Sequence, residues 1–189
     1  MKEMREKLLI KLKGAKKVVF MGVGEEKLRD DAVSIYIISE LLTHSNEKYL
    51  FINAGIDPMS RIEDVVKFQP SHLVLIDTCT LNQPPGTIAI IERKNIQELV
   101  PISSHTIPIH IVVDLFLEKI SDLEVFMIGI VPESLEGFTK LSFYKENEYS
   151  LDERSENEDL PFFELNLTPT IKKVADGIIN LIKEIMKKI

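Results

Sequence analysis

The 189-residue sequence contains a single cysteine, Cys79, which excludes an internal disulfide framework and a zinc site built from cysteines. Basic residues are fewer than acidic ones, and the formal net charge of -7 disfavours a nucleic-acid-binding surface, which needs clustered cations. Long apolar runs are also lacking. The run Leu8-Leu9-Ile10 is too short for the core of a signal peptide, and no run could cross a membrane. We therefore expect a cytoplasmic monomer that binds neither nucleic acid nor membrane.

Apolar residues form short continuous runs that alternate with helically spaced repeats. Strands are predicted at 18–23, 49–52, 72–77, 87–91 and 124–130, and helices at 1–13, 31–42, 61–68, 109–120 and 169–189. Strands that alternate with helices predict an α/β fold, in which a twisted, mostly parallel sheet carries helices on both faces. The length fits a single domain over residues 1–189, with an N-terminal helical segment at 1–14.

Two local signals predict where helices begin. Ser60 followed by Glu63 is typical of a capping box at the start of the helix 61–68. Thr168 followed by Pro169 is typical of an N-cap with proline in the first helical position.

One segment, residues 139–164, does not fit this pattern, and we name it the acidic insertion. Its central part, 145–159, is dominated by Glu and Asp and has few apolar residues. Such a composition predicts an exposed loop rather than a packed element.

Acidic residues follow the first predicted strand, after a turn at Gly22 and Gly24. Ligands of open α/β sheets bind at the carboxyl ends of the strands, so Asp30 and Asp31 are candidate site residues. The pair could also serve only as a helix start, because Asp caps free N–H groups and complements the helix dipole. Dinucleotide binding is a further alternative, but Lys27 occupies the position of the third glycine that the fingerprint requires.

Two further candidate ligands lie at comparable places. Asp77 ends the third predicted strand, and His105 precedes the helix 109–120. Together with Asp31 they could hold a divalent transition metal and leave room for a substrate. Each could instead be structural. Cys79 with His105 offers a thiol mechanism, although a lone cysteine is more often a small buried hydrophobe.

The ordered set of motifs resembles the hydrogenase maturation proteases over about residues 17–138 and again in the last helix. The motifs are Gly22-Val-Gly24 with Asp30-Asp31, Leu75-Ile-Asp77, Pro85-Gly86, Ser103-Ser-His105 and Gly129-Ile-Val-Pro132. The sequence departs from the family pattern at Glu25, Ala32 and Asn53, where the family usually has Asn, Gly and an acidic residue. Relative to shorter family members, the acidic insertion is additional.

The resemblance implies an endopeptidase that removes the C-terminal extension from the large-subunit precursor of a nickel–iron hydrogenase. It assigns Asp31, Asp77 and His105 to the contacts with nickel, which the precursor delivers, and it implies no organic cofactor. Asp31 and Asp77 are the expected catalytic carboxylates, in either an aspartic-type or a metal-assisted reaction. A metal-sensing chaperone that binds the precursor without cutting it is the alternative.

Overall fold

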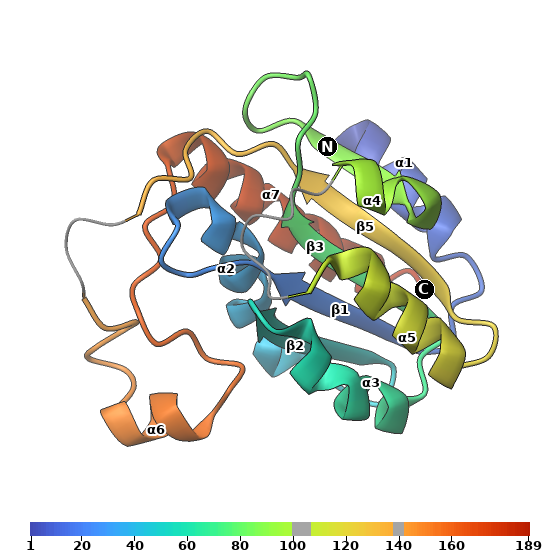
Figure 1. Ribbon diagram of the computed structural model, residues 1–189, viewed down its shortest axis with the longest axis horizontal. Coiled ribbons are helices and arrows are strands. Elements are labelled where there is room, and N and C mark those ends of the chain that lie inside the picture. Colours follow the sequence, from blue (N-terminus) through green and yellow to red (C-terminus); the bar gives the residue numbers. More distant parts are fainter. Residues whose placement is uncertain (100–106, 138–141) are drawn as a thin grey trace.

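The computed structural model describes residues 1–99, 107–137 and 142–189, and its central sheet has five strands in the order β2-β1-β3-β5-β4 (Figure 1). The strands are β1 Val18–Val23, β2 Tyr49–Gly55, β3 His72–Thr78, β4 Ile88–Glu92 and β5 Glu124–Ile130. β2, β1, β3 and β5 are mutually parallel, whereas β4 is antiparallel to β5. The predicted α/β fold with a mostly parallel sheet is therefore confirmed.

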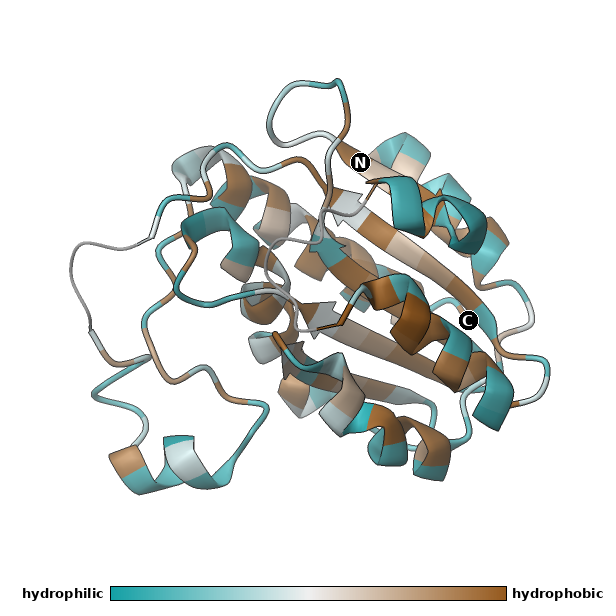
Figure 2. Cartoon of the chain, in the orientation of Figure 1, coloured by the Kyte–Doolittle hydropathy of each residue, from teal (hydrophilic) through white to brown (hydrophobic). Residues whose placement is uncertain are grey.

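Helices cover both faces of this sheet (Figures 1 and 2). On one face lie α1 (Lys2–Lys11), α2 (Val33–Ser39) and α7 (Pro169–Met186), and on the other lie α3 (Ile62–Phe68) and α5 (Ile109–Lys119). Successive side chains of β1 alternate between the two cores, with Phe20 in the first and Val19 and Met21 in the second. This burial on both faces explains why the parallel strands are apolar throughout.

Shorter elements connect these layers. The helices α4 (Ile96–Leu99) and α6 (Leu151–Glu156) and the 3₁₀ turns η1 (Arg29–Ala32), η2 (Leu42–His44), η3 (Pro58–Arg61) and η4 (Arg93–Asn95) lie within the described residues. None of the helices in that part of the chain has both the length and the apolarity required to cross a membrane.

Gly22 allows α2 to lie directly against β1. A Cβ atom at this position would approach the Cγ1 of Ile38 to 2.8 Å and the carbonyl oxygen of Ser34 to 2.9 Å. A side chain would therefore push the helix away from the strand. The glycine predicted to mark a turn thus serves close packing, and it keeps the start of α2 over the carboxyl end of β1.

The predicted start of the last helix agrees with the structure, and the end of the first helix agrees to within two residues, whereas α7 ends at Met186 rather than at 189. α1 ends before Gly14, whose φ of 81° lies in the left-handed region that favours glycine. At the other end of the chain, the Thr168 side chain accepts a hydrogen bond from the N–H of Ile171, and Pro169 is the first residue of α7. These signals depend on adjacent residues alone, which is why the sequence was sufficient to locate them.

Three predicted boundaries were wrong. The helix expected at 31–42 is divided into η1, α2 and η2, and the hydroxyl of Ser39 donates to the carbonyl of Tyr36 where α2 ends. β2 continues beyond Ile52 to Gly55, because it pairs with β1 through an irregular register there. The predicted capping box of α3 is not formed, since Ser60 donates to the carbonyl of Asp57 inside η3.

The expectation that 145–159 is only an exposed loop was also wrong. This stretch contains α6, which begins with a complete capping box between Ser150 and Glu153. Arg154 is buried on this helix, where its guanidinium group donates to the carbonyls of Tyr144 and Tyr149 at 2.7 and 2.6 Å. The acidic insertion is therefore a folded element held by a buried cation, and in Figure 1 α6 stands apart from the sheet.

Candidate active site at the carboxyl edge of the sheet

The chain order of the strands places a topological switch point between β1 and β3. From β1 the chain passes to β2 on one side, and it then crosses to β3 on the other side. The loops that follow β1 and β3 therefore diverge, and such a switch point is where open α/β sheets bind ligands. Asp31 lies in η1, just after β1, and Asp77 lies near the end of β3.

Asp31 is held rigidly by two hydrogen bonds. Its side chain is almost wholly buried; Oδ2 accepts from the N–H of Glu25 at 2.9 Å, and Oδ1 accepts from the hydroxyl of Thr78 at 2.8 Å. Gly24 makes this turn possible, because a Cβ there would lie 2.1 Å from the carbonyl oxygen of Asp31. The loop after β1 thus fixes both the backbone and the carboxylate of Asp31.

Thr78 connects Asp31 to Asp77. While the Thr78 hydroxyl donates to Asp31, its backbone N–H donates to Oδ1 of Asp77 at 2.7 Å. All three residues are buried at the carboxyl edge of the sheet. Two of the three predicted site residues are therefore brought together, by a threonine that no sequence signal had singled out.

His105 lies outside the described residues, so its position relative to the two carboxylates stays a prediction. Within residues 1–99, 107–137 and 142–189, no cluster of three His, Cys, Asp or Glu side chains is arranged to hold a metal ion. A metal site formed by Asp31, Asp77 and His105 consequently also stays a prediction.

Asp30 has a structural role that differs from that of its neighbour. It is fully buried, and its carboxylate accepts hydrogen bonds from the N–H groups of Glu133, Ser134 and Thr168 and from the Thr168 hydroxyl, at 2.7–3.0 Å. These bonds join the end of β1 to the segment after β5 and to the start of α7. Asp30 and Asp31, which formed one motif in the sequence, therefore have different roles. Asp30 holds three segments of the fold together, and Asp31 is a candidate site residue.

The thiol mechanism is disfavoured by the environment of Cys79. Burial, followed by the nearby charge of Asp77, raises the pKa of this thiol to about 12, so the nucleophilic thiolate is scarce at neutral pH. The sulfur also packs so closely on β5 that a Cβ at Gly129 would lie 2.8 Å from it. Cys79 is thus part of the second core.

Dinucleotide binding is disfavoured by the same loop that positions Asp31. A dinucleotide fold presents free N–H groups of the glycine-rich turn to a pyrophosphate. Here the N–H of Glu25 is bonded to Asp31, and that of Gly24 is bonded to the carbonyl of Gly55 at 2.9 Å. These donors are already occupied by the protein.

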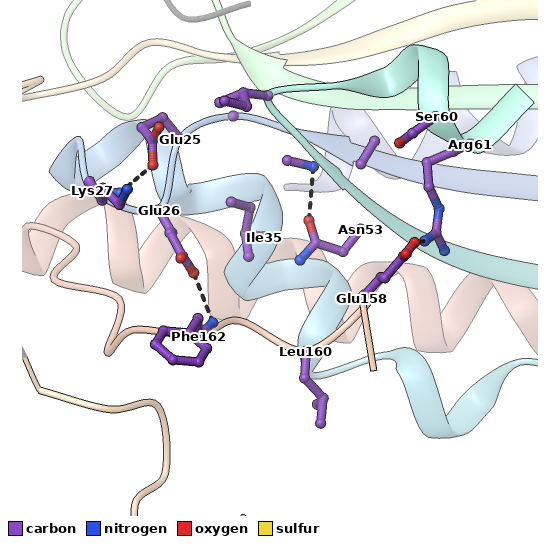
Figure 3. Close-up of a pocket in the computed structure, with 14 residues that line it drawn as sticks. Glu25, Glu26, Lys27, Ile35, Asn53, Ser60, Arg61, Glu158, Leu160 and Phe162 are labelled. Carbon is purple, nitrogen blue, oxygen red and sulfur yellow. Dashed lines mark hydrogen bonds and ion pairs between the residues drawn. The ribbon is translucent and has the colours of Figure 1, made fainter. Parts of the chain in front are cut away.

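A pocket of about 430 Å³ adjoins the loop that carries Glu25 (Figure 3). It lies between this loop, the end of β2 and the acidic insertion, and Ile35, Asn53, Leu160 and Phe162 contribute to its lining. The insertion therefore forms one wall of this cavity, and another wall is the loop 24–27, in which the N–H of Glu25 is bonded to Asp31.

Arg61, the last residue of η3, binds the acidic insertion to the segment between β2 and α3. Its buried guanidinium group lies 2.7 Å from Glu158 and 2.8 Å from Asp159. Asp159 also accepts from the N–H of Asn53 at 2.9 Å, at the outer edge of β2. Burial raises the pKa of Asp159, although the hydrogen bond from Asn53 and the charge of Arg61 act in the opposite direction.

The family model and the curated relatives all indicate one family. The hydrogenase maturation protease family model matches residues 35–152. A protein of Methanocaldococcus jannaschii that is itself assigned to this family is 34% identical over 141 residues, which make up 70% of this chain and 82% of that protein. The hydrogenase 3 maturation protease of Escherichia coli is 25% identical over 115 residues, or 61% of this chain and 72% of that protein.

Solved structures share the fold. The nickel–iron hydrogenase maturation protease HycI of Thermococcus kodakarensis superimposes with a TM-score of 0.70 at 23% identity, covering 96% of this chain and 99% of that one. The hydrogenase maturating endopeptidase HybD of E. coli gives 0.64 at 18% identity, with 91% and 93% covered. The extent of the family match and the identity to the M. jannaschii protein together show that this chain belongs to the hydrogenase maturation protease family.

Proposed function

We propose that this protein is an endopeptidase that removes the C-terminal extension of a nickel-loaded large-subunit precursor of a nickel–iron hydrogenase. Membership of the hydrogenase maturation protease family supports the reaction class. The observation that carries the assignment of residues is the joining of Asp31 and Asp77 through Thr78 at the switch point of the sheet.

In this proposal Asp31 and Asp77 act on the precursor through carboxylate oxygens. Each oxygen of Asp31 accepts one hydrogen bond from a neighbouring protein group, and a carboxylate oxygen has a second lone pair that can bind a metal ion or a water molecule. With His105 as the third ligand, they contact the nickel that the precursor carries. Nickel then belongs to the substrate, and recognising it restricts cleavage to loaded precursors.

Hydrolysis of the peptide bond requires an activated water molecule and a polarised carbonyl. Asp31, which lies at the end of the loop lining the pocket, is our choice for the general base. Its two hydrogen bonds fix the carboxylate in one orientation, as a base needs. The nickel of the precursor is well suited to polarise the carbonyl as a Lewis acid. An aspartic-type reaction would instead require one of the two carboxyl groups to stay protonated.

The test is to incubate the purified protein with nickel-loaded precursor and to identify the released C-terminal peptide by mass spectrometry. We expect release from the loaded precursor and none from a nickel-free one. Treatment of the free protein with a chelator, followed by its removal, should leave the rate unchanged, because nickel enters with the precursor. Binding of the loaded precursor without any released peptide would favour the chaperone instead, and tightly held stoichiometric nickel in the free protein would contradict delivery by the precursor.

A further inference from the structure

The acidic insertion is bonded to the very loop that holds Asp31. The carboxylate of Glu26 accepts a hydrogen bond from the backbone N–H of Phe162 at 3.0 Å (Figure 3), and another from the backbone N–H of Phe163 at 3.4 Å. Glu26 is half-buried between the two segments. A single side chain thus connects the insertion with the end of β1, more than 130 positions earlier in the sequence.

Three consecutive residues of this loop have distinct partners. The N–H of Gly24 donates to the carbonyl of Gly55 on β2, and the N–H of Glu25 donates to Asp31. The carboxylate of Glu26 accepts a hydrogen bond from the insertion, at Phe162. A shift of the backbone at Glu26 would therefore move the N–H that orients the Asp31 carboxylate, since the two residues are adjacent.

Residues 158–163 of the insertion cannot follow such a shift freely, because Glu158 and Asp159 are held by Arg61. Arg61 binds Glu158 and Asp159, and the stretch from there to Phe163 spans the pocket from β2 to the Glu26 loop. The residues that hold this stretch are Arg61 in η3 and Glu26 in the loop after β1. Residues 158–163 of the insertion are therefore held at both ends, and one of these attachments is on the loop that leads to the proposed base.

We propose that Glu26 is a positioning residue, through which the acidic insertion holds the Glu25 N–H and hence the carboxylate of Asp31 in its working orientation. This inference rests on the proposed function, in which Asp31 acts on the precursor. Misplacement of a reacting group by about 1 Å can cost on the order of a hundredfold in rate. The insertion then contributes to the chemical step from outside the site, without touching the precursor's reacting atoms.

The test compares two variants of Glu26 with one control variant at another position, all in the 189-residue protein. Glu26→Ala removes the acceptor, so kcat for precursor cleavage should fall about tenfold to a hundredfold, while KM stays within about twofold. Glu26→Gln keeps an oxygen that accepts from Phe162 and should retain most of the activity. Glu118→Ala, which changes an exposed glutamate in the last turn of α5, should behave like the wild type and serves as the matched control.

A second measurement separates positioning from simple stabilisation. The amide proton of Glu25, which is bonded to Asp31, should shift in ¹H–¹⁵N spectra of Glu26→Ala and return in Glu26→Gln. Wild-type kcat in a folded Glu26→Ala variant, or equal impairment of the Ala and Gln variants, would overturn the inference. If the Ala variant does not fold, Glu26→Asp replaces it, because a shorter carboxylate should lower kcat in a folded protein.

The failure of this inference can be distinguished from failure of the proposed function. Cleavage by Asp31→Asn at the wild-type rate would contradict the role of Asp31 itself. An inactive Asp31→Asn together with a fully active Glu26→Ala would leave the role of Asp31 intact and reject only the positioning by Glu26.

Discussion

Asp30 and Asp31 are adjacent, yet their partners predict opposite consequences for the same substitution. In Asp30→Asn, the side-chain NH₂ would face backbone N–H donors in a fully buried site, so the free energy of unfolding should fall by about 2–4 kcal/mol. Asp31→Asn should cost less stability, about 1 kcal/mol, because it loses a single bond to Glu25. It should nevertheless abolish processing. Urea unfolding and precursor cleavage, measured on both variants, check the contrast, which equal losses of stability would contradict.

Thr78 offers a test of the link between the two carboxylates. Thr78→Val keeps the shape of the side chain and the backbone N–H to Asp77, but it removes the hydroxyl that donates to Asp31. We expect processing to slow by about tenfold or more, since one of two bonds that orient Asp31 is lost. Thr78→Ser, which retains the hydroxyl, is the control and should stay active. Unimpaired processing by the valine variant would show that Asp31 needs no orientation from Thr78.

Cys79 should be dispensable for the reaction. Cys79→Ala removes a buried sulfur from the second core and should lower the free energy of unfolding by about 1 kcal/mol, because it leaves a small cavity. Cleavage of the precursor should continue at the wild-type rate, since a thiol with a pKa of about 12 is not ionised at neutral pH. Inactivation of the native protein by a thiol-alkylating reagent would instead revive the thiol mechanism.

Among the elements, many of those defined by neighbouring residues were predictable, although the capping boxes of α3 and α6 were not, whereas features that depend on distant partners could not be predicted. The strands and the start of α7 follow from local periodicity and from Thr168 with Pro169. Contacts between distant residues determine the strand order, the antiparallel direction of β4 and the different roles of Asp30 and Asp31. No local sequence pattern records such contacts. α6 was missed although Ser150 and Glu153 form a local capping box, because the acidic composition of 145–159 favoured a loop and concealed the burial of Arg154.

The attachment of the acidic insertion through Glu26 predicts a pH dependence of stability. Burial raises the pKa of Glu26 in the folded protein, and the hydrogen bonds from the N–H groups of Phe162 and Phe163 lower it by a smaller amount. The net effect is a raised pKa. The folded state therefore binds this proton more tightly than the unfolded state. The contribution of Glu26 to stability is then fully present below the unfolded pKa, and it declines as the pH rises through the folded pKa.

Glu26→Gln, which does not titrate, isolates this effect. The difference in the free energy of unfolding, wild type minus variant, should decrease as the pH rises from about 4.5, the unfolded value, through the raised folded value and then level off. Denaturant unfolding of both proteins between pH 4.5 and pH 8 measures it. A difference that grows with pH would mean that the hydrogen bonds outweigh burial at Glu26.

At the scale of the whole molecule, some carboxylates of the acidic insertion are bonded within the protein, whereas others in the described part of the chain are exposed without such a role in the fold. Glu158 and Asp159 are paired with Arg61, and Glu153 caps α6. Asp152 and Glu156, by contrast, are exposed on the same helix, and α6 stands apart from the sheet in Figure 1. Asp152 and Glu156 are therefore available to attract a basic surface of the precursor over a distance.

If α6 guides the precursor, neutralising Asp152 and Glu156 should slow association severalfold at low ionic strength and leave kcat unchanged. The difference should fade as salt is added, because screening at about 0.15 M already limits such attraction to roughly 8 Å. Glu47→Gln with Glu118→Gln changes the net charge equally at exposed positions near the opposite edge of the sheet, before β2 and at the end of α5, and is the matched control. Stopped-flow binding at low and high salt measures the rates. Equal slowing by the two pairs would indicate net charge rather than guidance by α6, and no slowing by either would leave α6 as a solvated surface.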